Sequence, residues 1–360
     1  MGFYSFTDYI VNEKNLINNM SVIKSKLKSG VKLCAVVKAN AYGVGSKIIS
    51  NIVYNHVDCY AVANLEEGII LRNIGIDKEI LVLGCMNFAY VDQYVYNFLT
   101  PTISTVCEMS KLSREVKSSF LVEFGLDTGM GRIGFSKKEE ILTAKAIVSE
   151  NKNIGLFGVF SHLATKENDI NFMYKQKGRF DELLECFDCK NVVCHLSNTN
   201  AALNHQDFNY DMVRVGFGLY GMMESDGLKP VISVESRVVK INNVKMGESI
   251  GYDRTFVASK DMVVAVVPLG YYDGMGRGLS NKGRVVINGR FANVVGRVCM
   301  DMFMVDVSDI ECVDVGTKVV VLGGEGESKI TLSDHAGYSD TSEYEVLARI
   351  NNSRMNVVIK

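Results

Sequence analysis

The stretch KLCAVVKANAYGVG, residues 32–45, passes from an apolar segment directly into Lys38 and then into a loop that contains two glycines. The apolar segment predicts a buried strand, and lysine is a residue that is rarely buried without a partner. Lys38 is therefore either a solvated strand end or an amine presented to a ligand. The choice between these two interpretations depends on the fold to which the strand belongs.

Seven more short apolar runs follow, with amphipathic segments between most of them. The eight runs cover residues 32–38, 59–63, 80–84, 102–104, 120–126, 154–161, 192–197 and 212–217. Strands that alternate with helices form parallel sheets, and eight alternations favour a closed (β/α)8 barrel over an open sheet. We therefore predict an α/β protein whose first domain, residues 1–233, is a TIM-like barrel.

The pattern changes after Pro230. Segments such as MVVAVVPLG and KVVVLGG are typical of strands, and turns rich in glycine, asparagine and aspartate separate them. Residues 234–360 are therefore predicted to form a separate domain that is mostly β. A final helical segment is expected at residues 341–350.

The composition is that of an ordinary soluble protein. Hydrophobic residues make up 47% of the chain, charged residues 22%, and the formal net charge is −2, without the basic excess of nucleic-acid-binding proteins. No apolar run approaches the roughly eighteen residues of a membrane helix, and the N-terminal residues lack a signal-peptide pattern. We expect a cytoplasmic protein that binds neither nucleic acid nor membranes.

The nine cysteines are scattered along the chain, which suits reduced thiols better than a disulfide framework. Cys186 and Cys189 form a lone CxxC pair. Because no second pair stands at zinc spacing, this pair is a weak indication of a metal or redox site. We expect no metal.

Reactive residues in such barrels lie at the C-terminal ends of the strands. Lys38 ends the first run, Arg132 follows the fifth, His162 the sixth and Thr199 the seventh, and Gly216 lies near the end of the eighth. The hydroxyl of a threonine and the backbone N–H groups around a glycine can bind a phosphate. A lysine amine that faces such a site is the arrangement expected for pyridoxal phosphate held as a Schiff base.

Seven motifs make the chain similar to alanine racemases. In order, they are KANAYG, DTGMGRIGF, SH at 161–162, SNT at 197–199, VRVGFGLYG, LGYYDG and VGRVCMD. The resemblance covers nearly the whole chain. It implies an amino-acid racemase that interconverts L- and D-alanine with pyridoxal 5'-phosphate on Lys38 and supplies D-alanine for peptidoglycan. It also implies a homodimer in which the β domain of one subunit completes the active site of the other.

Racemisation needs acid–base groups on both faces of a planar intermediate, and the resemblance assigns these roles to Lys38 and Tyr271. The pKa of a tyrosine, about 10, would have to be lowered by neighbouring positive charge. Without the resemblance Tyr271 would more often be structural, and Tyr272 would be an equal candidate. Arg214 resembles the arginine at the pyridine nitrogen, where a permanent cation favours racemisation over transamination. The sequence alone would instead suggest that it pairs with a surface carboxylate.

His162 resembles a histidine that links this arginine to the catalytic tyrosine, although a buried structural histidine fits equally well. Arg132 resembles the arginine that binds the substrate carboxylate, a role that suits its planar guanidinium. The resemblance assigns contacts with the cofactor phosphate to Tyr42, Asn198, Thr199, Gly216 and Phe217. It places Met300, Asp301 and Asn352 at the substrate.

Three positions depart from the family pattern. Gly125 replaces a lysine that many relatives carry in carbamylated form, so Arg132 must be held by another acid, by an anion, or less firmly. Glu123 is the nearest acid in the sequence. Val44 replaces a histidine, and Asn352 replaces a tyrosine that crowds the substrate methyl group. Serine racemases of the vancomycin-resistance type resemble this family and carry asparagine there, so a serine or dual serine/alanine racemase is an alternative.

Other functions are less consistent with the motifs. A dinucleotide site at Gly43–Gly45 would need a third glycine at position 48, which is Ile48. A non-catalytic pyridoxal-phosphate carrier would lack the second domain. A related decarboxylase would place an acidic residue, rather than Arg214, at the pyridine nitrogen.

Overall fold

The computed structural model describes residues 5–165, 167–221 and 227–360. It divides the chain into two compact units. We call the one formed by Ile17–Ala41 and Gly45–Leu219 the barrel unit. The β unit contains the chain up to Leu16, Tyr42–Val44, and the chain from Tyr220 onward.

Eight parallel strands form the sheet of the barrel unit, in the order β8-β7-β6-β5-β4-β3-β2-β9. They are β2 (Lys32–Val36), β3 (Cys59–Val62), β4 (Glu79–Cys85), β5 (Leu99–Ile103), β6 (Phe120–Gly125), β7 (Ile154–Phe160), β8 (Val193–His195) and β9 (Met212–Val215). The two ends of this order meet where Asp211 N donates to Cys194 O and Arg214 N to Ser197 O, both at 3.0 Å. The barrel is therefore nearly closed, and the predicted (β/α)8 architecture is confirmed.

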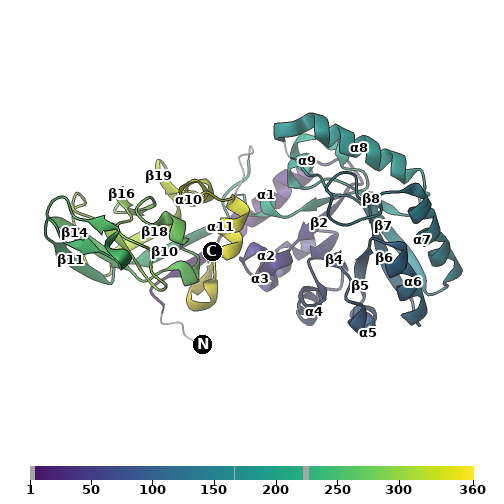
Figure 1. Cartoon of the computed structure of the whole chain (residues 1–360), viewed down its shortest axis with the longest axis horizontal. Coiled ribbons are helices and arrows are strands. Elements are labelled where there is room, and N and C mark those ends of the chain that lie inside the picture. Colours follow the sequence, from purple (N-terminus) through teal and green to yellow (C-terminus); the bar gives the residue numbers. More distant parts are fainter. Residues whose placement is uncertain (1–4, 166, 222–226) are drawn as a thin grey trace. The chain divides into compact units, whose positions relative to one another are not determined.

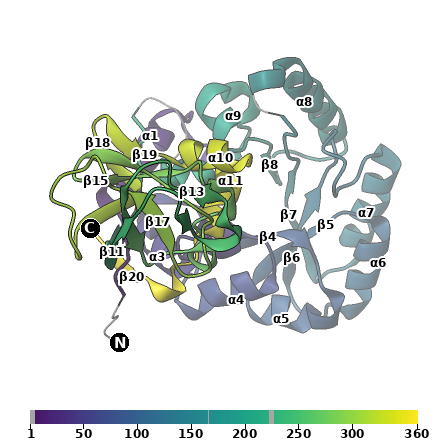
Figure 2. The same cartoon turned by 60° about the vertical axis from the view of Figure 1, so that its left-hand side comes forward.

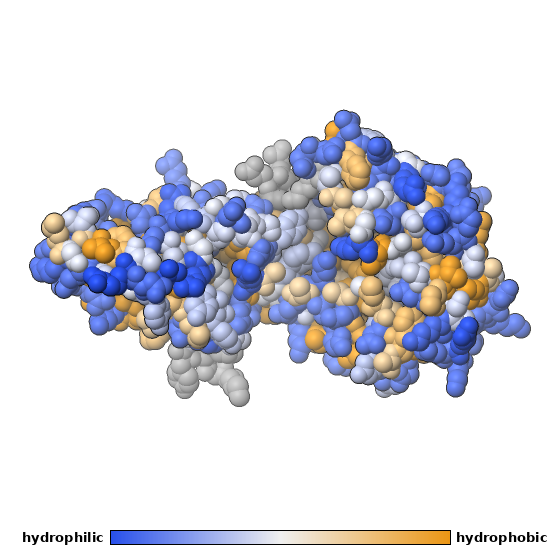
Figure 3. All heavy atoms as spheres, in the orientation of Figure 1, coloured by the Kyte–Doolittle hydropathy of each residue, from blue (hydrophilic) through white to orange (hydrophobic). Residues whose placement is uncertain are grey.

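Helices surround the strands of the barrel unit (Figures 1 and 2). They are α1 (Glu13–Ser25), α3 (Ser46–Val53), α4 (Leu65–Asn73), α5 (Val91–Tyr96), α6 (Val106–Glu115), α7 (Lys138–Glu150), α8 (Ile170–Leu184) and α9 (Thr199–Asn204). Side-chain caps mark where several begin: Thr105 and Glu108 form a capping box on α6, and Asp169 accepts from Phe172 N on α8. On the face drawn in Figure 3, hydrophilic residues cover much of the outer surface of these helices.

The β unit contains two main sheets. The larger has the order β16-β15-β18-β10-β1-β20, with β19 paired to β18, and the smaller has the order β11-β14-β17. The strands are β1 (Asp8–Val11), β10 (Ile232–Arg237), β11 (Lys240–Val244), β14 (Met262–Val267), β15 (Arg284–Ile287), β16 (Arg290–Asn293), β17 (Phe303–Asp306), β18 (Lys318–Glu325), β19 (Ser328–Ile330) and β20 (Asn356–Ile359). A short hairpin, β12 (Ser249–Ile250) and β13 (Phe256–Val257), and two helices, α10 (Leu332–Ser339) and α11 (Glu343–Arg349), complete the unit.

The compact units differ from the predicted domains at the N-terminus and at the boundary. Strand β1 pairs antiparallel with β10 and parallel with β20, so the start of the chain belongs to the β unit rather than to the barrel. The C-terminal segment of this unit begins at Tyr220 and not at residue 234. A single short strand carries no sequence signal for the sheet that it joins, because its partners lie more than two hundred residues away. The expected final helix corresponds to α11, whereas α10 was not predicted.

Candidate active site

The residues predicted to be reactive in the barrel unit follow the ends of its strands. Lys38 comes two residues after β2, Arg132 lies in the loop after β6, and His162 follows β7. Because the strands are parallel, their C-terminal ends meet at one rim. The charges of Arg132 and Arg214 both act on the Lys38 amine, as expected for groups gathered at one mouth.

Lys38 is followed by a turn of left-handed helix. Residues 39–42 have φ angles of 53°, 52°, 54° and 58°, and none of them is a glycine. Left-handed helix costs L-residues about 1–2 kcal/mol each, so it persists only where the surroundings enforce it, often at functional sites. Three hydrogen bonds hold it here: Ala41 N to Val37 O at 2.8 Å, Gly45 N to Asn40 O at 2.9 Å, and Ala39 N to Glu67 Oε1 at 2.7 Å.

Glu67 was not predicted, and it supports this turn from the first turn of α4. Its second carboxylate oxygen accepts from Ala63 N at 2.8 Å. The carboxylate therefore joins the end of β3 to the residue after Lys38, and its charge opposes the lowering of the Lys38 pKa. The sequence signal was the spacing Asn64-x-x-Glu67, which suggests only a helix cap.

The pKa of the Lys38 amine is lowered from its ordinary value. Burial is the largest cause, and the positive charge of Arg132 acts in the same direction, as does that of Arg214. A lowered pKa increases the fraction of neutral amine near neutral pH. Only the neutral amine can attack a carbonyl carbon, so these surroundings suit a lysine that binds an aldehyde.

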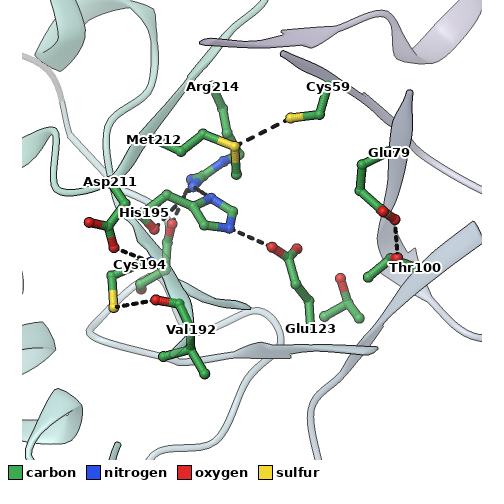
Figure 4. Close-up of polar contacts among 12 residues, drawn as sticks. Cys59, Glu79, Thr100, Glu123, Val192, Cys194, His195, Asp211, Met212 and Arg214 are labelled. Carbon is green, nitrogen blue, oxygen red and sulfur yellow. Dashed lines mark hydrogen bonds and ion pairs between the residues drawn. The ribbon is translucent and has the colours of Figure 1, made fainter. Parts of the chain in front are cut away.

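Arg214 lies inside the barrel on β9 and is only 4% exposed. Its Nη1 donates to His195 Nδ1 at 2.6 Å, and its Nη2 donates to the carbonyl oxygen of Ser161 at 2.6 Å (Figure 4). This burial excludes the alternative in which Arg214 pairs with a surface carboxylate. Burial also lowers the pKa of its guanidinium to about 10, and Glu123 is the main charge that opposes this change.

His195 and Glu123 complete a buried polar row that the sequence reasoning missed. His195 Nε2 lies 2.5 Å from Glu123 Oε1, and both side chains are fully buried. The signal available was a lone acid in the apolar run FLVEFG, residues 120–125. Because Glu123 is bound to His195, it is not the acid that replaces the missing carbamate at Arg132.

His162 lies at the edge of the same row. Its Nδ1 is 3.5 Å from Arg214 Nη2, and Gln176 Nε2 donates to its carbonyl oxygen at 3.0 Å. Burial lowers the pKa of His162 to about 3, with the positive charges of Arg214, Arg132 and Lys38 acting in the same direction. The imidazole is therefore neutral near pH 7. Its predicted link to a catalytic tyrosine stays a prediction.

The candidate phosphate site lies where β8 and β9 end. Thr199 Oγ1 accepts from Gly216 N at 3.2 Å and from Gly218 N at 3.4 Å, so its own O–H is left to donate elsewhere. Asn198 caps α9 by accepting from Ala201 N. A Cβ at position 218 would lie 2.3 Å from Thr199 Cγ2, so only glycine permits this approach. Phe217, the last predicted residue here, is buried.

Arg132 lies in an exposed part of the loop after β6. Among the residues that the structure describes, no carboxylate is within ion-pair distance of its guanidinium. Asp127 instead shapes the loop by accepting from Gly129 N at 2.9 Å and Gly131 N at 3.1 Å. A Cβ at position 125 would lie 3.1 Å from Thr102 Cγ2. The place that many relatives fill with a lysine is therefore not left empty here.

Tyr271, Met300 and Asp301 come together in the β unit. Tyr271 begins a short 3-10 helix, Tyr271–Asp273, and its N–H donates to Cys299 O at 3.0 Å. The next N–H, of Tyr272, donates to Met300 O at 3.2 Å. The predicted tyrosine and the loop that carries the two predicted substrate residues are therefore directly hydrogen-bonded.

Arg354, which was not predicted, joins these two segments a second time. Its guanidinium contacts both oxygens of the Asp273 carboxylate at 2.9 and 2.8 Å, and its Nη1 donates to Asp301 Oδ1 at 2.8 Å. Arg354 ends the 3-10 helix that Asn352 begins. Tyr42 also belongs to the β unit, where its ring lies 5.8 Å from that of Tyr220 and burial raises its pKa.

Comparison with known proteins agrees with this arrangement. A sequence model of the alanine racemase N-terminal domain matches residues 11–224, and a model of the C-terminal domain matches residues 231–359. The chain belongs to the alanine racemase family. Alanine racemase from Ligilactobacillus salivarius is 35% identical to it over 97% of both chains. Alanine racemase from Clostridium kluyveri is 36% identical over 97% of this chain and 93% of its own length. The crystal structure of alanine racemase from E. faecalis superposes with a TM-score of 0.94 at 31% identity, covering 100% of both chains.

The matches to both alanine racemase domain models confirm the resemblance that the seven motifs indicated. The three relatives described above are alanine racemases, so they do not favour the serine racemase alternative that Asn352 suggested. A dinucleotide-binding protein and a decarboxylase are likewise not supported. No helix in the described part of the chain is long and apolar enough to cross a membrane.

Proposed function

We propose that this chain interconverts L- and D-alanine with pyridoxal phosphate bound at the mouth of the barrel. The observation that carries the proposal is Lys38, a lysine at the end of a barrel strand, fixed by a left-handed turn and with a lowered pKa. A solvated strand end would need neither the burial nor the strained turn.

Residues of the barrel unit fit the cofactor. The Lys38 amine would bind the aldehyde, and the free O–H of Thr199 together with the backbone around Gly216 and Phe217 would bind the phosphate. Arg214 would face the ring nitrogen, and Asn198 would add a contact to the phosphate. The family resemblance assigns the same contact to Tyr42, which belongs to the β unit rather than to the barrel unit. Bound pyridoxal phosphate would supply an electron sink for the negative charge that develops at the substrate α-carbon.

Two groups would move the α-proton. Lys38 would take it from, or return it to, one face of the substrate, and Tyr271 would do the same on the other face. Arg132, which has no acid beside it in the described structure, would bind the substrate carboxylate. His162 would remain neutral and add no charge to the site, and Met300, Asp301 and Asn352 would line the substrate on the side of Tyr271.

A homodimer is part of this proposal, with Tyr271 of the partner subunit serving the barrel. Tyr271, Met300 and Met302 are 44%, 52% and 43% exposed, which leaves apolar surface on the β unit that a second subunit would cover. Sedimentation of the purified protein would test it. The cytoplasmic location stays a prediction from the sequence.

Racemisation of L-alanine by the purified protein, followed by loss of optical rotation, tests the proposed function. Lys38→Ala should abolish turnover of both enantiomers, and Tyr271→Phe should reduce it severely. Tyr272→Phe is the matched control, because this neighbour has a similar exposure, 49%, and its ring also packs on Arg354. Normal turnover by Lys38→Ala would refute the role of the lysine, and equal effects of the two phenylalanine variants would refute that of Tyr271.

A second readout does not depend on turnover. Borohydride reduces a Schiff base to a stable amine, so treatment of the enzyme should fix the cofactor to the peptide that contains Lys38 and remove its visible absorbance band. Label on any other lysine would contradict the proposed cofactor site.

A further inference from the structure

We propose that Glu123, acting through His195, is the counter-ion and orienting group of Arg214, and that this buried row sets the charge that the barrel presents to a bound cofactor. Glu123 and His195 are positioning residues on this view, and their effect on catalysis rests on the proposed function. The row itself, Glu123–His195–Arg214, is drawn in Figure 4.

The hydrogen bonds fix where the imidazole proton lies. A guanidinium can only donate, and Arg214 Nη1 is 2.6 Å from His195 Nδ1, so Nδ1 must be the unprotonated acceptor. The proton of the neutral ring is then on Nε2, which donates to Glu123 Oε1 at 2.5 Å. The ring cannot rotate without losing both contacts, and its stacking on Phe160, with centroids 5.3 Å apart, holds it in plane.

The charges show why Glu123 matters to Arg214. The guanidinium is buried, and its other hydrogen-bond partners are neutral: the His162 imidazole and the carbonyl oxygens of Ser161, Leu196 and His195. An unpaired cation in such a place is costly. Among the charged groups that act on Arg214, Arg132 disfavours its protonated form, and Glu123 is the one that favours it most.

Other charged groups around the row have partners of their own. The carboxylate of Asp211, which acts on His195, accepts from the backbone N–H of Cys194 at 2.8 Å. Glu79 also lies inside the barrel, but its carboxylate accepts from the Thr100 hydroxyl. Among the charged residues that the structure describes, only Glu123 is joined to Arg214 by a continuous line of hydrogen bonds.

Glu123 contributes charge more than hydrogen-bonding capacity. Its second oxygen, Oε2, is buried and has no hydrogen-bond partner in the described structure, which is a cost that a purely structural residue would not need. Glutamine can accept the same proton from His195 Nε2 and has nearly the same shape. The substitution Glu123→Gln therefore removes the negative charge and leaves the contact in place.

The first test uses the holoenzyme. Glu123→Gln should lower kcat for alanine by about tenfold, less than the roughly hundredfold loss for a group that contacts the reacting atoms, and should leave KM nearly unchanged. It should also shift the visible absorbance band of the cofactor, because the charge near the ring nitrogen changes. Glu79→Gln, the same substitution on β4, should change neither. An unchanged kcat and spectrum in Glu123→Gln would overturn the proposal.

The second test needs no variant to fold. The chain has only five histidines, so the ring nitrogens of ¹⁵N-histidine-labelled enzyme can be assigned by NMR. His195 should appear as the Nε2–H form, with a low-field proton that exchanges slowly with water. An Nδ1–H form, or a rapidly exchanging proton, would overturn the proposal. If the wild-type protein shows this signal but neither binds pyridoxal phosphate nor racemises alanine, the proposed function fails and the buried row stands.

Discussion

Gly270→Ala is the substitution for which the structure predicts the clearest loss of function. Gly270 lies between β14 and Tyr271, and its backbone is extended, with φ at −135°, so alanine would meet no conformational penalty. The problem is space. A Cβ at this position would lie 2.1 Å from Met300 O, 2.3 Å from Met300 C and 2.5 Å from Asp301 N, whereas real Cβ contacts are essentially never shorter than 3.0 Å.

The atoms in the way belong to the backbone and cannot rotate aside. The turn of Tyr271 and the loop of Met300 must separate, which stretches the bonds from Tyr271 N to Cys299 O and from Tyr272 N to Met300 O. Overpacking of this kind costs about 1–3 kcal/mol of stability. A catalytic group displaced by roughly 1 Å loses about a hundredfold in rate, so we expect kcat/KM to fall more than stability does.

Racemisation kinetics and urea unfolding of the same preparation separate these two effects. The matched control is Gly337→Ala in α10 of the same unit, where a Cβ would meet nothing within 4 Å. This control should keep full activity and gain roughly 0.5–1 kcal/mol, because alanine is the better helix former. A Gly270→Ala enzyme with the wild-type kcat/KM would refute the argument that Tyr271 is positioned by its contact with this loop.

Two further predictions concern single side chains. Arg354→Met removes the paired contact with Asp273 and the bond to Asp301, so the free energy of unfolding in urea should fall by about 1–3 kcal/mol. Arg354→Lys should recover only part of this free energy, because lysine cannot bind both carboxylate oxygens at once. The pKa of His162 is about 3 in the folded chain, and its ordinary value is 6.5. On acidification the unfolded chain therefore takes up a proton that the folded chain does not, and the stability of the folded chain falls below pH 6.5. Between about pH 7.5 and pH 5.5 this loss should amount to roughly 1 kcal/mol, and His162→Gln should show a correspondingly smaller decrease. An equal decrease in the variant would show that other groups account for it.

The barrel could be predicted from the sequence because its strands carry their own signal. A parallel strand that is buried on both sides consists of consecutive apolar residues, and β3, with four buried residues in the run CYAV, is an example. Strand β1 has a similar composition but lies in the β unit, because its partners β10 and β20 are set by long-range pairing. Local pattern identifies such a strand and cannot identify its sheet.

The candidate site divides in the same way. The positions of Lys38 and Thr199 could be predicted because each follows a recognisable strand and lies within a recognisable motif, and their roles stay predictions. Glu123, His195 and Arg354 could not, because their importance arises from partners on other strands or segments, 72 positions apart in the case of His195 and Glu123. A lone charge in an apolar run indicates that a buried partner exists, but not which residue it is.

The charges of the barrel mouth explain why these hidden partners are needed. Lys38 and Arg132 lie at the rim of the barrel and Arg214 is buried inside it on β9, and the charge of each arginine lowers the pKa of Lys38. Such a cluster attracts the phosphate of a cofactor and the carboxylate of an amino acid, but like charges repel one another in the folded chain before any anion is bound. The carboxylates of Glu67 and Glu123 reduce this repulsion. Glu67 accepts from the backbone N–H of Ala39, next to Lys38, and Glu123 is joined to Arg214 through His195. Because neither acid contacts Lys38 or Arg214 directly, neither carboxylate occupies a hydrogen-bond donor of these two groups, whereas a direct ion pair would use donors that an anionic ligand needs.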